Sequence, residues 1–499
     1  MTSRRRAFAL PRRRWRVLGL VTVVALALVL VRAGEGGDPG PPPQSALALV
    51  PRDALVVLHA STDRERPPVA AARRLLERFA AWPGVRDRIR EGLVPRGCPP
   101  LEPIGDEIAL ALVPDGAGRA SPLALVEVGT QDAGPPVRRC GGQQVRRLGR
   151  FLAIGRPAVV RAARALHERL PGARSFAREP LVRELTEGLP RDRVLDAWVT
   201  RDGLRRVLVP QGGLPATLAT LVDRPGLAGA AVAVAPRDAG ARIVVRTRGA
   251  APGRSPFAPA AATSAPAGAL ASLRTVDPLG DVRRLLAAVG EREGQALLRR
   301  ATTATARLVA DGSSRLRRDL VDAVRGSSEI VLLPGGRGLS TAMAIVVPVT
   351  DGARARAALR SLHDRIPAIA GGRLRRTTVA GRPAWMLAWR DGVQLGYLVV
   401  GNRVILFTRP GAAREVLRPR SPLSAVDGFA RTTATGGKPV MSIGFLDFQR
   451  LLRAVGSAGL ADRSAYAAVE GDLAAIRAVG MVSRASGGDT TASIDLWIP

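Results

Sequence analysis

Two stretches of this chain repeat one pattern: residues 150–161 read RFLAIGRPAVVR, and residues 403–414 read RVILFTRPGAAR. Each begins with an apolar run typical of a strand, continues with Arg-Pro, and ends in residues that favour a helix. Proline suits the first helical turn, where its missing N–H is not needed, so Pro157 and Pro410 are expected at helix starts. The match has no gap, and it predicts that the two stretches superpose as strand, turn and helix.

Working outward, equivalent elements flank both stretches in the same order. Each half opens with an apolar strand and an amphipathic helix containing Arg-Arg-Leu-Leu, followed by a strand that begins with Glu-Ile. After the repeated stretch, Asp202 and Asp447 are expected to cap the start of a helix. The matched pairs are the strands 54–61 and 269–276, the helices at 72–79 and 282–289, the strands 107–113 and 329–333, the strands 123–128 and 342–349, and the hairpins 228–248 and 478–498.

This duplication predicts an α+β fold with a single N-terminal transmembrane helix and two similar domains, each an antiparallel or mixed sheet with helices on one face. Stretches rich in Gly and Pro predict flexible connections. The expected organisation is a basic cytoplasmic tail (1–16), a transmembrane anchor (17–32), a flexible tether (33–45), a first repeat (46–249), a linker (250–268) and a second repeat (269–499).

The anchor is expected because residues 17–31 read VLGLVTVVALALVLV and are preceded by seven arginines and no acid. Arginines beside a membrane helix stay cytoplasmic, which predicts a single-pass protein of the cell membrane with the bulk of the chain extracytoplasmic. The run spans roughly 22 Å of a ~30 Å hydrocarbon core, and Arg16 and Arg32 can snorkel to the interfaces. A cleaved signal peptide is the alternative, because a run of this length also suits such a segment.

The net charge of +33 would ordinarily indicate a polyanionic partner. Lys438 is the only lysine, however, and such a bias toward Arg, Ala, Gly and Pro is typical of a genome rich in G and C. We therefore favour scattered solvated arginines and keep a polyanion-binding face as the alternative. Arg156 and Arg409 could form a paired anion site, but a turn that needs proline explains them. Nucleic acid is not favoured, because aromatic residues are only 3% and form no basic stripe.

Cys98 and Cys140 lie in turn-rich stretches of the first half. If the chain is exported, a disulfide bond between them is the favoured interpretation, and two unrelated thiols are the alternative. Neither has the Cys-x-x-Cys spacing of a redox or zinc site.

No motif in the sequence indicates chemistry. His59, His167 and His363 stand in separate expected elements without a second ligand at metal spacing. The signatures of zinc proteases, serine hydrolases, P-loops and dinucleotide-binding folds do not occur. No cofactor, metal or catalytic residue is expected.

Neighbouring carboxylates are the only other candidates for acid–base work. Asp106 lies beside Glu107, and Asp192 lies four residues before Asp196. Nearness in sequence is not geometry, and we expect these side chains in solvated turns or helix caps.

The opening Val50-Pro51-Arg52-Asp53-Ala54 resembles a family of membrane-anchored proteins of unknown function in high-GC Gram-positive bacteria, marked by a Pro-x-Asp-Ala strand opening soon after the anchor. The resemblance would cover residues 46–499 and implies no activity. The second half has Gly268 where the first has Asp53, which puts any role for that aspartate in doubt.

Together these features predict a non-catalytic, envelope-associated binding module that touches the membrane through its N-terminal helix and binds an envelope polymer or a protein. An envelope hydrolase with a carboxylate site between the repeats is the first alternative, and an apolar-ligand carrier is the second.

Overall fold

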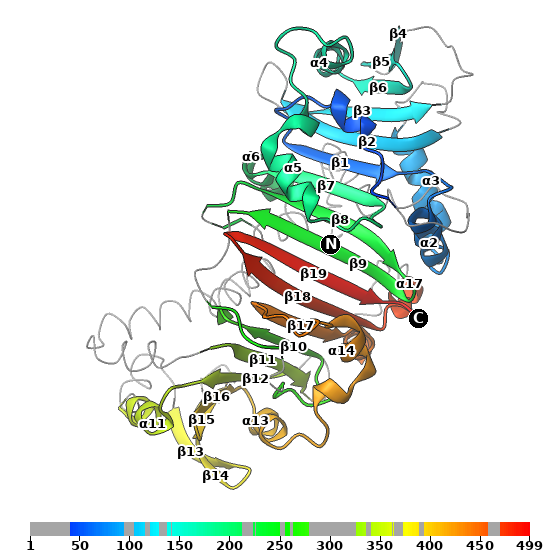
Figure 1. Ribbon diagram of the computed structural model, residues 1–499. Helices are drawn as coiled ribbons and strands as arrows, with labels where there is room; N and C mark the ends of the chain where they lie inside the picture. The colour runs from blue at the N-terminus through cyan, green and yellow to red at the C-terminus, as the bar shows by residue number, and fades with distance from the viewer. Residues whose placement is uncertain are drawn as a thin grey trace, which may run out of the picture. The chain divides into compact units, whose positions relative to one another are not determined.

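The structure is a computed structural model, and its contacts divide the chain into two units (Figure 1). Unit 1 comprises Met1–Asp238 and Val244–Ala250, and unit 2 comprises Ala239–Ile243 and Ala251–Pro499. The described residues are 40–93, 104–114, 120–128, 137–140, 142–211, 223–224, 226–249, 255–259, 263–278, 326–335, 341–361, 363, 373–388, 394–457 and 470–499. The expected tail and anchor, and the expected helix at 282–289, lie outside them.

Unit 1 is built on an antiparallel sheet. Its strand order is β4-β5-β6-β3-β2-β1-β7-β8, and every ladder in that order is antiparallel. A two-residue turn leads from β8 into β9 (Gly240–Arg248), which is divided between the units. The strands are β1 (Val56–Ser61), β2 (Ile104–Pro114), β3 (Ala120–Val128), β4 (Val137–Cys140), β5 (Gln143–Leu148), β6 (Phe151–Gly155), β7 (Leu195–Thr200) and β8 (Gly229–Arg237).

Unit 2 has the order β13-β14-β15-β16-β12-β11-β10-β17-β18-β19, again antiparallel throughout. When β1 is matched with β10 and β4 with β14, the two units follow the same strand order, and β13 is an addition in unit 2. The strands are β10 (Ala271–Thr275), β11 (Ser328–Pro334), β12 (Thr341–Pro348), β13 (Arg373–Val379), β14 (Arg382–Ala388), β15 (Gln394–Val400), β16 (Arg403–Phe407), β17 (Ser442–Asp447), β18 (Ala478–Ser486) and β19 (Asp489–Trp497).

Equivalent hydrogen bonds fix the register of the first strands. In unit 1 the Leu55 amide donates to the Leu112 carbonyl at 2.8 Å, and in unit 2 the Leu270 amide donates to the Leu332 carbonyl at 2.8 Å. Leu55 therefore matches Leu270, and Leu112 matches Leu332. This match assigns an equivalent position in β10 or β11 to the residues of β1 and β2.

Helices cover both faces of each sheet, which corrects the expectation of helices on one face. In unit 1 these are η2 (Ser45–Leu49), α2 (Pro67–Leu76), α3 (Trp82–Leu93), α4 (Pro157–His167), η3 (Phe176–Arg178), α5 (Pro180–Glu187), α6 (Arg201–Gly203), η4 (Leu204–Leu208) and η5 (Val209–Gln211). In unit 2 they are α11 (Gly352–Arg360), α13 (Pro410–Leu417), η6 (Leu423–Ala425), α14 (Asp427–Thr432), α15 (Phe448–Ser457) and α17 (Glu470–Ala475).

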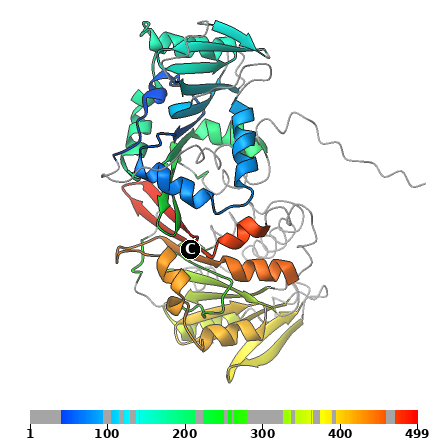
Figure 2. The same ribbon diagram turned by 90° about the vertical axis from the view of Figure 1, so that its right-hand side faces the viewer.

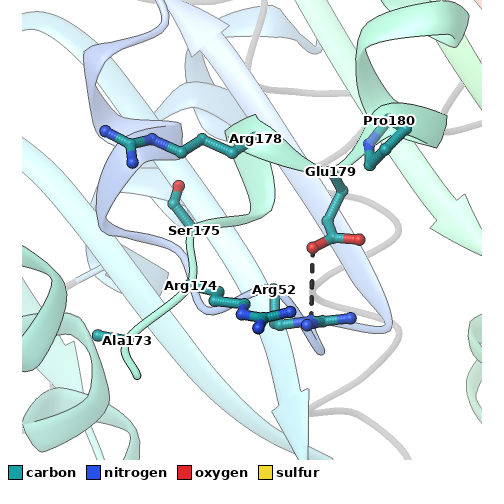
Figure 3. Close-up of a pocket in the computed structure, with 7 residues that line it drawn as sticks. All are labelled: Arg52, Ala173, Arg174, Ser175, Arg178, Glu179 and Pro180. Atoms are coloured by element: carbon teal, nitrogen blue, oxygen red, sulfur yellow. Dashed lines mark ion pairs between the residues drawn. The ribbon is translucent and has the colours of Figure 1, made fainter. Parts of the chain in front are cut away.

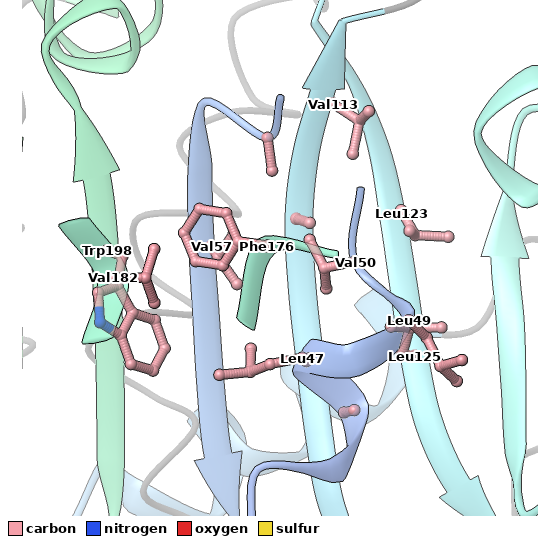
Figure 4. Packing of buried hydrophobic residues seen from close by; sticks show 14 of the residues in the cluster. Leu47, Leu49, Val50, Val57, Val113, Leu123, Leu125, Phe176, Val182 and Trp198 are labelled. Carbon is pink, nitrogen blue, oxygen red and sulfur yellow. The ribbon is translucent and has the colours of Figure 1, made fainter. Parts of the chain in front are cut away.

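The alternation of side chains along β2 shows why unit 1 needs two helical layers. Ala109 joins the main core with η2, α4 and α5, whereas its neighbour Ile108 packs with Trp82 of α3 on the opposite face. Figure 4 shows Leu47 of η2 and Val182 of α5 in the main core, and Figure 2 shows helices of unit 1 on either side of its strands. In the main core the Phe176 and Trp198 rings pack edge-to-face with centroids 6.2 Å apart. Of the two sheet types expected, antiparallel or mixed, all the ladders described above are antiparallel, and both faces of the unit 1 sheet carry apolar residues.

The repeated stretch forms a strand followed by a helix in each unit, and Pro157 and Pro410 stand at the starts of α4 and α13. The gap-free match is wrong within the strand. It would pair Phe151, which packs in the core beneath α4, with Val404, which packs with α11 on the other face. Core-facing residues therefore align one position apart, and unit 2 has one extra residue before its proline.

The helix caps were half correctly predicted. Asp447 accepts a hydrogen bond from the Arg450 amide at 2.9 Å, as an N-cap should. In unit 1 the N-cap is Thr200, whose hydroxyl accepts a hydrogen bond from the Gly203 amide at 3.0 Å. Asp202 lies exposed in the first turn of the helix. The cap sits at the end of the strand in both units, two residues earlier in unit 1 than expected.

The expectations of a single-pass anchor and of a membrane localisation are corrected. Within the described part of the chain, no helix has both the length and the apolar character needed to cross a bilayer. Residues 17–32, where the anchor was expected, lie outside that part.

Candidate functional site

A buried histidine lies between two buried carboxylates in the sheet of unit 1. His59 lies on β1 between Glu107 of β2 and Asp196 of β7, its neighbours in the sheet. The ring Nε2 lies 3.5 Å from Glu107 Oε1, and Nδ1 lies 3.5 Å from Asp196 Oδ2. All three side chains are 0% exposed. We call these three residues the buried triad.

Backbone amides from the segment before β1 hold Glu107. The Ser45 amide donates to its Oε1 at 2.8 Å, and the Ala46 amide donates to its Oε2 at 3.0 Å. The Arg150 guanidinium lies 3.7 Å from Oε2, at the edge of ion-pair range. These amides fix the carboxylate in place and stabilise its charge.

Asp196 has two further partners. Gln44 Nε2 donates to its Oδ2 at 2.9 Å, and Arg193 Nε lies 2.6 Å from its Oδ1. The Arg193 side chain is itself only 4% exposed. The charges of Arg193 and a protonated His59 thus balance those of the two carboxylates, as burial of ionised groups requires.

The protonation of the triad follows from these contacts. Burial by itself acts to lower the pKa of His59, but the hydrogen bonds and charges of Asp196 and Glu107 outweigh it and raise that pKa above its ordinary value of 6.5. Burial acts to raise the pKa of Glu107, and His59 with the Ser45 and Ala46 amides lowers it below 4.5. The contacts thus favour the charged form of His59 and the ionised form of Glu107.

This outcome corrects the sequence expectation for two carboxylates. Glu107 and Asp196 were expected in solvated turns or caps, and both are buried on strands. The strand alternation of 56–61 was the available signal, because it places His59 on the same face as the core residue Val57. Their neighbours do reach solvent: Asp106 is exposed, and Asp192 pairs with Arg237 at 3.0 Å.

The other histidines lie apart from the triad. His167 is exposed at the end of α4. His363 of unit 2 contacts the Tyr397 hydroxyl, and its ring lies tilted against that of Trp385, with ring centroids 4.1 Å apart. Burial raises the pKa of Tyr397 to about 12. Among the described residues, no group of three His, Cys, Asp or Glu side chains is arranged to hold a metal ion.

A solvent-accessible pocket of about 420 Å³ lies elsewhere on unit 1 (Figure 3). The segment before β1 and the segment joining α4 to α5 form it, and its charged side chains are Arg52, Arg174, Arg178 and Glu179. Arg52 Nε lies 3.4 Å from Glu179 Oε1, with the two side chains 48% and 29% exposed. We call this the arginine pocket.

The remaining sequence candidates are two arginines and two cysteines. Arg156 and Arg409 precede α4 and α13 in separate units, and the Arg409 guanidinium donates to the Gly335 carbonyl. Cys140 ends β4, but Cys98 lies outside the described residues. The disulfide bond therefore stays a prediction.

No protein-family model matches this chain, and no curated protein matches it. Among solved structures, crystal form I of TP0453 is similar with a TM-score of 0.23 and 12% identity, over 44% of this chain and 81% of that one. Crystal form III gives a TM-score of 0.24 and 10% identity, over 44% and 83%. Likeness at this level carries no argument about fold or function, and the family resemblance suggested by Val50-Pro51-Arg52-Asp53-Ala54 stays a prediction.

Proposed function

We propose that this chain is a non-catalytic binding protein whose partner is anionic. The observation that carries the proposal is the closure of the buried triad. General acid–base catalysis needs a proton donor or acceptor within hydrogen-bond reach of a substrate. Because His59, Glu107 and Asp196 are 0% exposed and contact one another and Arg193, they serve to hold three strands and the segment before β1 together.

The groups that do reach solvent are mainly cationic. The chain carries 75 Lys and Arg against 42 Asp and Glu, and the lining of the arginine pocket includes three arginines and one glutamate. Such a surface attracts anions and raises their rate of encounter. The same pocket does not fit an apolar ligand, because its lining is mostly charged or polar.

A binding assay with a turnover readout tests the proposal. Full-length protein is immobilised and offered polyglutamate, polyphosphate, neutral dextran and polylysine at several salt concentrations. We expect the two acidic polymers to bind, with affinity that falls as salt rises, and dextran and polylysine not to bind. Mass spectrometry of the same mixtures should show every polymer intact.

Two results would contradict the proposal. Equal binding of dextran and the acidic polymers would show that the protein does not select an anionic partner. Time-dependent cleavage of a polymer by the wild type, lost in the isosteric variant Glu107→Gln, would make the buried triad catalytic.

A further inference from the structure

The arginine pocket has a backbone framework that unit 2 repeats. The Arg52 amide donates to the Arg174 carbonyl at 3.0 Å, and the Ala267 amide of unit 2 donates to the Ser421 carbonyl at 2.8 Å. The bridge between Pro51 and Ser175 likewise has its counterpart in unit 2. The same loop geometry is thus built twice in one chain.

The side chains on this framework differ. Where unit 1 has Arg52, Arg174, Arg178 and Glu179, unit 2 has Ala267, Ser421, Ala425 and Val426. The loop therefore folds without charged side chains at these four positions. Formation of the loop therefore does not require the three arginines of unit 1. Their presence in the lining of one pocket indicates a role other than stabilising the loop.

Their charges are only partly balanced within the pocket. Glu179 pairs with Arg52, and this pair is weak because both side chains are solvated. Neither Arg174 nor Arg178 has an ion-pair partner in the part of the chain that the structure describes. Three guanidinium groups and one carboxylate leave a surplus of two positive charges.

We propose that the arginine pocket binds the phosphate group of a small phosphate monoester. The surplus of two charges matches the charge of about −1.5 to −2 that such a group carries near pH 7, whereas a carboxylate would neutralise only half of it. Planar guanidinium groups donate in pairs to phosphate oxygens, which makes arginine suited to this ligand. A volume of about 420 Å³ also admits the alcohol part of the ester. This proposal rests on the proposed function and locates a specific site within it.

Calorimetric titration of the full-length protein tests the site with glycerol 3-phosphate, inorganic phosphate and glycerol. We expect the ester and inorganic phosphate to bind and glycerol not to bind. The substitutions Arg52→Ala, Arg174→Ala and Arg178→Ala should each weaken binding about tenfold, and the triple variant should abolish it. Stronger binding of the ester than of inorganic phosphate would show that the alcohol part contributes, and equal binding would identify free phosphate as sufficient.

A matched control separates this site from general charge. Arg414, Arg418 and Arg420 are exposed in unit 2, and their triple replacement by Ala removes the same charge. This variant should bind the ester as the wild type does. Grafting Ala267→Arg, Ser421→Arg and Ala425→Arg onto the matching loop should create a second site.

The outcomes are distinguishable from failure of the proposed function. If both triple variants bind the ester as tightly as the wild type, the site is wrong even where acidic polymers still bind. If both triple variants lose affinity equally, binding reflects net charge and the site is again wrong. If the wild type binds neither ester nor acidic polymer, the site and the proposed function fail together.

Discussion

At one position of the shared framework, unit 1 places His59 on its first strand and unit 2 places Arg274. The neighbour of His59 across β2 is Glu107, and the equivalent neighbour of Arg274 is Ser327, whose hydroxyl accepts from Arg274 Nε at 2.7 Å. On the other side Asp196 is replaced by Ile443. One strand order therefore accommodates a buried ionic group in one unit, and in the other a cation that donates to the Ser327 hydroxyl and lies over the Phe257 ring.

The buried glutamate of unit 2 also differs in position from that of unit 1. Glu329 stands where unit 1 has Ala109, two residues along the strand from the place of Glu107. It accepts from the Ser264 amide at 2.6 Å and from the Ser272 hydroxyl at 2.9 Å. In both units a strand glutamate accepts hydrogen bonds from the segment that precedes the first strand. The two glutamates have the same role but stand two residues apart in the matched strands.

The largest expected effect comes from breaking the buried triad. Glu107→Ala leaves an imidazolium and two amides without their acceptor and should cost about 3–5 kcal/mol in the free energy of unfolding. Ser327→Ala removes one hydrogen bond and should cost about 1 kcal/mol. Urea denaturation measures both, and hydrogen exchange assigns the loss to β1 and β2 or to β10 and β11. Equal losses would show that the buried charges contribute nothing special to unit 1.

One buried aromatic residue in each core allows the stability contributions of matched positions in the two units to be compared. Trp198 and Phe445 are 2% and 4% exposed and each packs edge-to-face on one other ring. Replacement of either by Ala should cost about 3–5 kcal/mol, because each leaves a large cavity. Urea denaturation with hydrogen exchange should localise each loss to its own unit. A loss below about 1 kcal/mol at one site would mean that the two cores do not depend on equivalent residues.

A smaller effect should appear in the dependence of stability on pH. Because folding raises the pKa of His59, its contribution is fully present below about pH 6.5 and is lost as the pH rises through the folded value. Because folding lowers the pKa of Glu107, its contribution is present above about pH 4.5 and is lost as the pH falls through the folded value. Urea midpoints from about pH 6 to about pH 9 should decline for the wild type and stay flatter for His59→Gln. Parallel curves for the two proteins would contradict the protonated histidine.

The smallest effects are expected at the helix caps. Thr200→Ala and Asp447→Ala should each cost about 1 kcal/mol, since each removes the acceptor of a helical amide. Asp202→Ala is the control and should change stability by less than about 0.5 kcal/mol. Thermal unfolding of the three variants measures the difference. A larger loss of stability for Asp202→Ala than for Thr200→Ala would show that Asp202 is the helix cap, as the sequence predicted.

The local pattern of residues was sufficient to predict many individual elements. Apolar strand signals located the first strands of both halves, and a proline after an apolar run located the starts of α4 and α13. These features depend on neighbours along the chain: side-chain periodicity and the missing N–H of proline act within a few residues. The same local rules placed the cap at Asp447 correctly and at Asp202 wrongly, because both Thr200 and Asp202 have the chemistry of a cap and only the end of the strand selects between them.

Only the tertiary structure decided which residues meet across the sheet. His59, Glu107 and Asp196 come from strands far apart in sequence, and each looked solvated or ordinary when taken alone. Arg52 and Arg174 are likewise brought together by one backbone hydrogen bond between distant segments. A charge becomes buried, paired or accessible through the partners that pack around it, and sequence periodicity carries no information about those partners. The sequence by itself thus determined local elements and the high content of arginine. The packing of the sheet decided which charged side chains are buried in unit 1 and which reach solvent.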